Sequence, residues 1–125
     1  MRYLIVTITA LLINFTANAE EKRTITVSLL SPSSGWSISI DEVYKVDKEL
    51  WVIASLSNHP GPGLQVITTV QDSIEITAED LPLKHFVLGK TWNWENKEDM
   101  TFIKDRKDIA DDLAKGKRLY TKEKK

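Results

Sequence analysis

Hydrophobic and polar residues alternate along much of the chain, which is the pattern of a β-strand with one buried face. In residues 24–29, isoleucine, valine and leucine take every second position, and threonine and serine take the others. The same period recurs in residues 36–40, and after Asp41 and Glu42 interrupt it, Val43 resumes it. Both segments are therefore predicted to be half-buried strands.

A third strand is predicted for residues 50–56, where both parities are apolar. Leucine, valine and alanine alternate there with Trp51 and Ile53. A strand that is apolar on both sides is typical of the interior of a sheet with both faces covered. We therefore expect this segment to be a central strand.

Shorter strand patterns follow towards the C-terminus. Residues 64–70 and 73–77 alternate again, and residues 84–94 form a longer candidate with apolar residues on one parity. Residues 95–99 are predicted to be a charged hairpin tip, after which residues 100–103 return as an edge strand. Several short strands separated by turns predict an antiparallel sandwich or barrel.

One helix is predicted near the C-terminus. Asp105 can cap its first turn, and Asp108 places a carboxylate where exposed backbone amides favour it. Ile109 and Leu113 lie one turn apart, and Gly116 ends the helix. We expect this helix to dock on the sheet through a narrow apolar stripe.

These elements predict an all-β fold, namely a small antiparallel β-sandwich of immunoglobulin-like type with one short C-terminal helix. A chain of 125 residues has room for one domain of ordinary size. The expected boundaries are a signal peptide at residues 1–19, a single β-sandwich domain at residues 20–120 and a disordered basic tail at residues 121–125.

The first 19 residues have the composition of a secretory signal peptide. Arg2 supplies a positive end, residues 3–15 are almost entirely apolar, and residues 17–19 are small enough for cleavage. The apolar stretch is shorter than the roughly 20 residues that span a bilayer. We therefore predict cleavage near Ala19 and a periplasmic or secreted protein, without stable membrane insertion afterwards.

Composition narrows the compartment and the class of partner. The chain has 17 basic and 18 acidic residues, a formal net charge of −1 and no cysteine. Near neutrality provides no field that would favour nucleic acid or an anionic membrane as partner. The absence of cysteine excludes disulfides, thiolate zinc sites and thiol nucleophiles, and it favours a bacterial periplasmic protein over a eukaryotic secreted domain.

No catalytic, metal-binding or cofactor-binding residues are predicted. His59 and His85 are far apart in the sequence and fit no metal-ligand spacing. Ser37 lies in a strand pattern with no base partner in view and no nucleophile elbow around it. The chain is therefore predicted not to be an enzyme.

Two features stand out as candidate binding sites, and the first is a proline-glycine loop. It comprises Asn58, His59, Pro60, Gly61, Pro62 and Gly63. The prolines fix φ and keep the preceding residues extended, so the loop is expected to be stiff and to lose little entropy on binding. A plain connection between two strands is the alternative interpretation.

The second feature is the pair Trp92 and Trp94. Their alternate spacing places both indoles on one side of an extended segment, where they can form a platform for a sugar ring or a partner surface. Burial is the alternative, because the pair continues the parity of Phe86 and Leu88.

The glycine-aromatic entry and Ile-x-Ile strand of residues 34–40, the strand 50–54 and the loop 60–63 resemble the PrcB C-terminal-like domain of secreted bacterial proteins. The resemblance covers about residues 34–66. It implies a small envelope β-domain that associates with a protease and has no catalytic residues of its own.

The sequence thus predicts a secreted or periplasmic, non-enzymatic protein-interaction module. It would contact its partner through the loop 58–63, with an envelope protease as the candidate partner and inhibitor-like binding as one form of the contact. The alternative is a carbohydrate-binding module that uses Trp92 and Trp94. No cofactor is expected.

Overall fold

A computed structural model describes residues 20–59 and 65–122, and the predicted signal peptide at residues 1–19 lies outside these ranges. The described strands are β1 (Glu21–Ser31), β2 (Trp36–Val46), β3 (Glu49–Asn58), β4 (Thr68–Ala78), β5 (Leu83–Leu88), β6 (Thr101–Ile103) and β7 (Lys117–Thr121). Between β6 and β7 lie a 3-10 turn, η2 (Arg106–Ile109), and a short helix, α1 (Ala110–Ala114). The described chain is mainly β with one short helical segment, as predicted.

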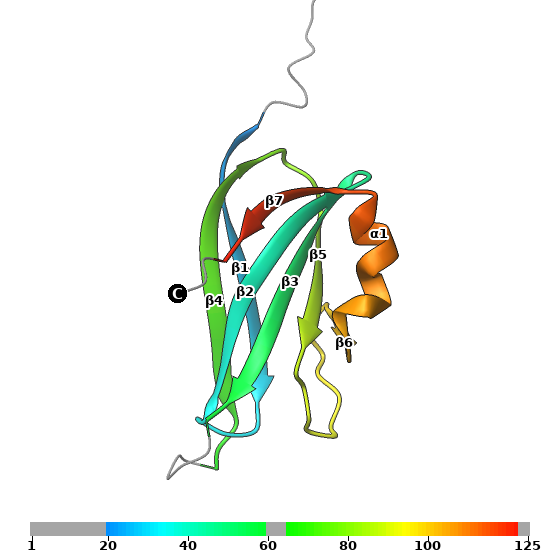
Figure 1. The fold of residues 1–125 in the computed structure, drawn as a ribbon. Coiled ribbons are helices and arrows are strands. Elements are labelled where there is room, and N and C mark those ends of the chain that lie inside the picture. The colour runs from blue at the N-terminus through cyan, green and yellow to red at the C-terminus, as the bar shows by residue number, and fades with distance from the viewer. Residues whose placement is uncertain (1–19, 60–64, 123–125) are drawn as a thin grey trace, which may run out of the picture.

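The strands form two sheets (Figure 1). β1 and β4 make a two-stranded antiparallel sheet, and the other sheet has the order β6-β5-β3-β2-β7. β2 and β3 form an antiparallel hairpin, whereas β5 runs parallel to β3 and β6 runs parallel to β5. The expectation of a wholly antiparallel fold is therefore wrong for β5 and β6.

The main core lies between the two sheets. Ile25, Val27 and Leu29 of β1 are at most 1% exposed, and they pack against alternate residues of β2, β3, β4 and β5. Burying an aliphatic side chain of this size stabilises the fold by about 1.5–3 kcal/mol. The two-residue period of β1 is therefore the direct cause of this face-to-face packing.

β3 is central in the five-stranded sheet, as its apolar residues on both parities predicted. β2 and β5 flank it, and Leu50 and Val52 face the core between the sheets. Trp51 and Ile53 face the opposite side, which η2 and α1 cover (Figure 1). This second cluster comprises Val46, Trp51, Ile53, Phe86, Ile109 and Leu113.

The predicted helix cap is confirmed. The Asp105 carboxylate accepts a hydrogen bond from the Lys107 amide at 2.9 Å, and the Asp108 carboxylate accepts one from the Asp105 amide at 3.4 Å. This reciprocal arrangement is a capping box. Ile109 and Leu113 are 6% and 4% exposed, so the narrow apolar stripe docks on the sheet as expected.

Replacing Asp105 with alanine is expected to lower the free energy of unfolding by about 1 kcal/mol, because the Lys107 amide loses its acceptor. Asp111→Ala is the matched control, since Asp111 is exposed on α1 and makes no cap hydrogen bond. Urea denaturation of both variants measures the difference. Equal losses would show that the cap contributes nothing.

Two strand boundaries differ from the prediction. β4 is one continuous strand that pairs with the whole of β1, whereas two shorter strands, the first from residue 64, were expected. β5 ends at Leu88 because Gly89 has a φ of 95°, which turns the chain out of the strand. Trp92 and Trp94 therefore do not continue β5, and residues 89–100 form an irregular connection to the parallel strand β6. The predicted hairpin is therefore wrong, whereas the edge strand expected at residues 100–103 is present as β6.

β7 is a strand that the sequence pattern did not indicate. It pairs with residues 42–45 of β2, and the Lys122 amide donates to the Asp41 carbonyl at 2.8 Å. Only Leu119 and Tyr120 of β7 reach the core, so its periodicity is weak. The prediction of a disordered tail from residue 121 is wrong for Thr121 and Lys122, and residues 123–125 lie outside the described ranges.

Candidate functional site

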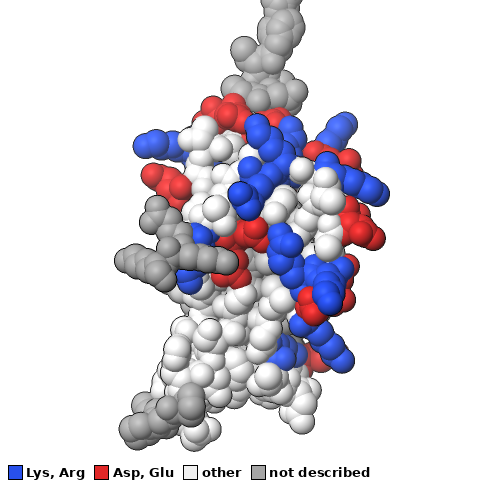
Figure 2. All heavy atoms as spheres, viewed as in Figure 1, with Lys and Arg blue, Asp and Glu red and all other residues white. Residues whose placement is uncertain are grey.

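One end of the molecule is built from segments without charged residues. Residues 24–40 and 50–71 contain no lysine, arginine, aspartate or glutamate. These segments meet where Trp36 pairs with Asn58 and where Ser31 pairs with Thr68. On the face shown in Figure 2, charged side chains crowd the upper part, and the described residues of the lower end appear white. We call the described residues 30–37, 57–59 and 65–69 the uncharged end.

The uncharged end also exposes aliphatic side chains. The exposed large hydrophobic residues of the described chain are Leu30, Val66 and Ile67, which are 42%, 54% and 66% exposed, and all three belong to it. Protein surfaces that are depleted of charge and expose neighbouring apolar side chains are typical of the central part of an interface. This end is therefore suited to a contact that excludes water.

Three half-buried indoles form a cluster that starts at Trp36 in the uncharged end. The rings of Trp36 and Trp92 are 5.0 Å apart in a T-shaped arrangement, and those of Trp92 and Trp94 are 5.5 Å apart with a tilt of 35°. Trp36 and Trp92 pack against the main core. The structure thus brings the predicted pair together through the irregular connection, and burial takes part of the surface of Trp92.

A short hydrogen-bond relay fixes the segment that carries these indoles to β1. The Trp92 indole N–H donates to the Asn96 side-chain oxygen at 2.9 Å, and the Asn96 side-chain nitrogen Nδ2 donates to the Leu30 carbonyl at 2.9 Å. The Leu30 amide in turn donates to the Glu98 carboxylate at 2.8 Å. The relay therefore occupies the backbone groups of Leu30 on the edge of β1, which blocks pairing with another strand at that residue.

The Glu98 carboxylate is held in its charged form. Burial acts to raise its pKa, but hydrogen bonds from the backbone amides of Glu98 and Leu30 and from the Asn96 side chain outweigh burial and lower the pKa below its usual value. A carboxyl whose pKa is lower in the folded than in the unfolded state stabilises the fold at pH values above the unfolded-state pKa. This contribution disappears as the pH falls through the folded-state pKa.

Glu98→Gln is expected to destabilise the protein near pH 7, and the effect should become smaller as the pH falls through the folded-state pKa of Glu98 and the wild-type carboxyl is protonated as well. Urea denaturation midpoints of both proteins, measured from pH 7 downwards, test this. A difference between variant and wild type that stays constant with pH would contradict the role of the Glu98 charge.

The first residues of the predicted binding loop belong to the uncharged end. Asn58 and His59 are exposed there, and the His59 amide donates to the Gly35 carbonyl at 2.8 Å. The remaining residues of this loop lie outside the described ranges, namely Pro60, Gly61, Pro62 and Gly63.

A contact between Ser37 and His59 was not anticipated from the sequence. The Ser37 hydroxyl oxygen and His59 Nε2 are 3.3 Å apart, because the β2–β3 register places Ser37 opposite Ser57. Both side chains are exposed, and within the described ranges no carboxylate forms a hydrogen bond with His59. A nucleophilic serine needs an oriented base and oxyanion donors, so this contact does not constitute a hydrolase site.

Comparison of the chain with protein-family models, with curated proteins and with solved structures gave no match. Among residues 20–59 and 65–122, no group of three or more histidine, aspartate or glutamate residues is arranged to hold a metal ion. In the same part of the chain, none of the helices has the length and apolar composition needed to cross a membrane.

Proposed function

We propose that this protein is a secreted or periplasmic, non-enzymatic protein-interaction module that docks through its uncharged end. The observation that carries the proposal is that Leu30, Val66 and Ile67 are exposed in segments that contain no charged residues. Each such side chain gains about 1.5–3 kcal/mol when it is fully buried. The three segments carry no charged side chain, and the Glu98 carboxylate beside Leu30 already has a hydrogen-bond donor in the Leu30 amide, which lowers the desolvation cost of forming an interface there.

The partner and the compartment are part of the same proposal. Export is supported by the apolar segment and small residues at positions 3–19 and by the absence of cysteine. The resemblance to PrcB C-terminal-like domains makes an envelope protease the first partner to test. The loop 58–63 would extend the contact surface from His59, which already belongs to the uncharged end.

We also propose that the two sheets form a small β-sandwich. The packing of β1 and β4 on the five-stranded sheet supports a small β-sandwich in which the core holds the uncharged end in place. The immunoglobulin-like assignment stays a prediction, because the parallel pairings of β3, β5 and β6 depart from an antiparallel pattern.

A charge introduced at the uncharged end tests the proposal. The protein is used to capture crosslinked partners from its native envelope fraction, and Ile67→Glu is compared with Thr77→Glu, which adds the same charge at an exposed position of β4. We expect Ile67→Glu to lose the partner that the wild type and Thr77→Glu retain. Equal capture by both variants would refute docking at this end.

Carbohydrate binding is the second candidate function, and the contact between two half-buried indoles favours it. The Trp92 ring is tied to Asn96 and to the core, so Trp94 is the residue left to stack on a sugar. Titration with polysaccharides should then change the indole fluorescence of the wild type but not that of Trp94→Ala. An unchanged signal across polysaccharides would end this alternative.

A further inference from the structure

Residues 95–100 tie the irregular connection after β5 to the edge of β1. Among residues 20–59 and 65–122, two hydrogen bonds join this segment to β1, and both are made by backbone groups of Leu30. The Leu30 amide donates to the Glu98 carboxylate at 2.8 Å, and the Leu30 carbonyl accepts from Asn96 Nδ2 at 2.9 Å. The attachment therefore depends on one carboxylate and one amide side chain.

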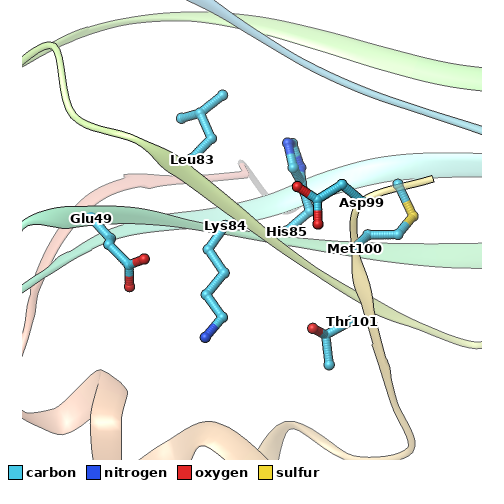
Figure 3. Close-up of a pocket in the computed structure, with 7 residues that line it drawn as sticks. All are labelled: Glu49, Leu83, Lys84, His85, Asp99, Met100 and Thr101. Atoms are coloured by element: carbon cyan, nitrogen blue, oxygen red, sulfur yellow. The ribbon is translucent and has the colours of Figure 1, made fainter.

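The same segment lies beside His85 of β5. Strand alternation places His85 on the side of the main core, whereas Lys84 points to the other side of the sheet (Figure 3). The His85 side chain is half-buried, and its Nδ1 atom is buried without a hydrogen-bond partner within the described ranges. Figure 3 shows the imidazole beside Asp99, which follows Glu98 directly in the chain. Two consecutive acidic residues thus connect His85 with the attachment to β1.

The contact between the segment and β5 is not closely packed throughout. A cavity of about 260 Å³ is lined by residues 83–85 of β5, by residues 99–101 and by Glu49. Close packing is what makes a protein interior resist displacement. Residues 99–101 border open space instead, so this part of the segment can shift without opening the core between the sheets.

Asp99 is the charged group whose field acts on the His85 imidazole. β6 and the core-facing parity of β3 carry no titratable side chain. Charged side chains on the core-facing parity of β1, β2 and β4 have partners of their own, namely Arg23, Lys45 and Asp72. On the segment itself, the Glu98 carboxylate is directed to the Leu30 amide.

Protonation of His85 is disfavoured while the segment lies against it. Burial lowers the pKa of His85 and outweighs the attraction of Asp99. When the segment moves away, the imidazole gains water, and its pKa returns towards the ordinary value of about 6.5. Because the released form then binds the proton more tightly than the closed form, acidification below about pH 6.5 shifts the equilibrium towards release.

Glu98 acts in the same direction at lower pH. The hydrogen bonds to its charged form lower its pKa while the segment is attached. Protonation removes the charge and weakens the bond from the Leu30 amide. Both titrating groups therefore favour release of the same segment as the pH falls.

We propose that residues 95–100 form a pH-dependent clamp that holds the edge of β1 at Leu30 near neutral pH and releases it on acidification, when His85 and then Glu98 take up a proton. Release frees the amide and the carbonyl of Leu30, which belongs to the uncharged end. The effect of the clamp on docking rests on the proposed function, whereas the clamp itself is a property of the isolated chain.

Amide hydrogen exchange separates release of the clamp from unfolding of the sheet. In an antiparallel pair, residues that bond to the neighbouring strand alternate with residues whose backbone groups point away from it. The Leu30 amide bonds to Glu98, so the Leu29 amide is directed to β4 and serves as an internal control. Nuclear magnetic resonance at pH 7, 6 and 5 gives the protection factors of both amides, corrected for the intrinsic exchange rate.

We expect the protection factor of Leu30 to fall at least about threefold between pH 7 and pH 5, because one proton changes such an equilibrium by up to about tenfold per pH unit. The protection factor of Leu29 should change by less than about twofold, since the pairing of β1 with β4 stays intact. This comparison needs no variant.

Two histidine variants identify the trigger. His85→Gln removes the titrating group and keeps a polar side chain, and His59→Gln is the matched control because His59 is exposed and lies outside the clamp. We expect His85→Gln to abolish the fall in Leu30 protection between pH 7 and pH 5, and His59→Gln to retain it. Glu98→Gln should lower Leu30 protection already at pH 7, because the amide loses its charged acceptor.

Constant protection of Leu30 between pH 7 and pH 5 would overturn the proposal. A parallel loss at Leu29 would also overturn it, because β1 would then be separating from β4. An unchanged fall in His85→Gln would show that His85 is not the trigger. The proposed function fails separately, since equal capture by Ile67→Glu and Thr77→Glu would refute docking and leave these exchange results standing.

Discussion

Ile25→Ala is expected to lower the free energy of unfolding by about 3 kcal/mol, within the range of 2–5 kcal/mol typical of such truncations in cores. Ile25 is 0% exposed and lies in the core between the two sheets. Truncation removes its transfer free energy and leaves a cavity that neighbours on two sheets cannot close together. Domains of this size are stable by only about 5–15 kcal/mol, so the variant would lose a large fraction of its stability.

The matched control is Ile67→Ala, which removes the same atoms from a side chain that is 66% exposed. Its free energy of unfolding should change by less than about 0.5 kcal/mol. Urea denaturation followed by tryptophan fluorescence measures both variants. Comparable losses would mean that the sheet of β1 and β4 does not close a core over Ile25.

The contrast between these two isoleucines also marks what the sequence pattern can predict. β1, β2 and β3 were anticipated because each alternates, or is apolar on both parities, over many residues, and burial on one or two faces imposes that period. The helix was anticipated because its cap and stripe are local in sequence. Periodicity identifies which residues are buried, but it does not identify their partners.

The errors arise where contacts between distant segments decide the structure. β7 forms because β2 offers an edge at residues 42–45, and the short, charged sequence of β7 has no strong period of its own. The parallel pairing of β5 and β6 depends on how residues 89–100 cross the molecule, and that of β3 and β5 depends on the passage through β4 in the other sheet. No local pattern encodes either path. The indoles were therefore assigned to a strand that ends before them.

The candidate site could be predicted only in part for the same reason. The pairing of Trp92 with Trp94 and the position of His59 follow from near neighbours in sequence, and the structure brings both to one end of the molecule. Trp36 joins the indoles through a long-range contact. The sequence does contain a signal for the uncharged end: residues 24–40 and 50–71 lack charge, and strand pairing of such segments predicts an uncharged surface.

The position of the indoles depends on Gly89, and Gly89→Ala is expected to lower the free energy of unfolding by at least about 2 kcal/mol. Gly89 has a φ of 95°, and an added Cβ would lie 2.6 Å from the Leu56 carbonyl oxygen. A non-glycine residue in such a conformation costs about 1–3 kcal/mol before any clash is counted. Because the carbonyl belongs to central strand β3, the chain at residue 89 has to move instead.

That movement gives the prediction a second readout. Residues 89–100 carry Trp92, Trp94 and the relay to Leu30, so displacement at residue 89 should change the tryptophan emission of the folded protein. Gly35→Ala is the control, because its added Cβ would lie 3.0 Å from the His59 carbonyl oxygen and glycine there has no positive φ. We expect a smaller loss of stability for Gly35→Ala. A smaller loss of stability for Gly89→Ala than for Gly35→Ala would contradict this prediction. The close approach of residue 89 to β3 would then not be the reason that β5 ends there and that the indoles lie where they do.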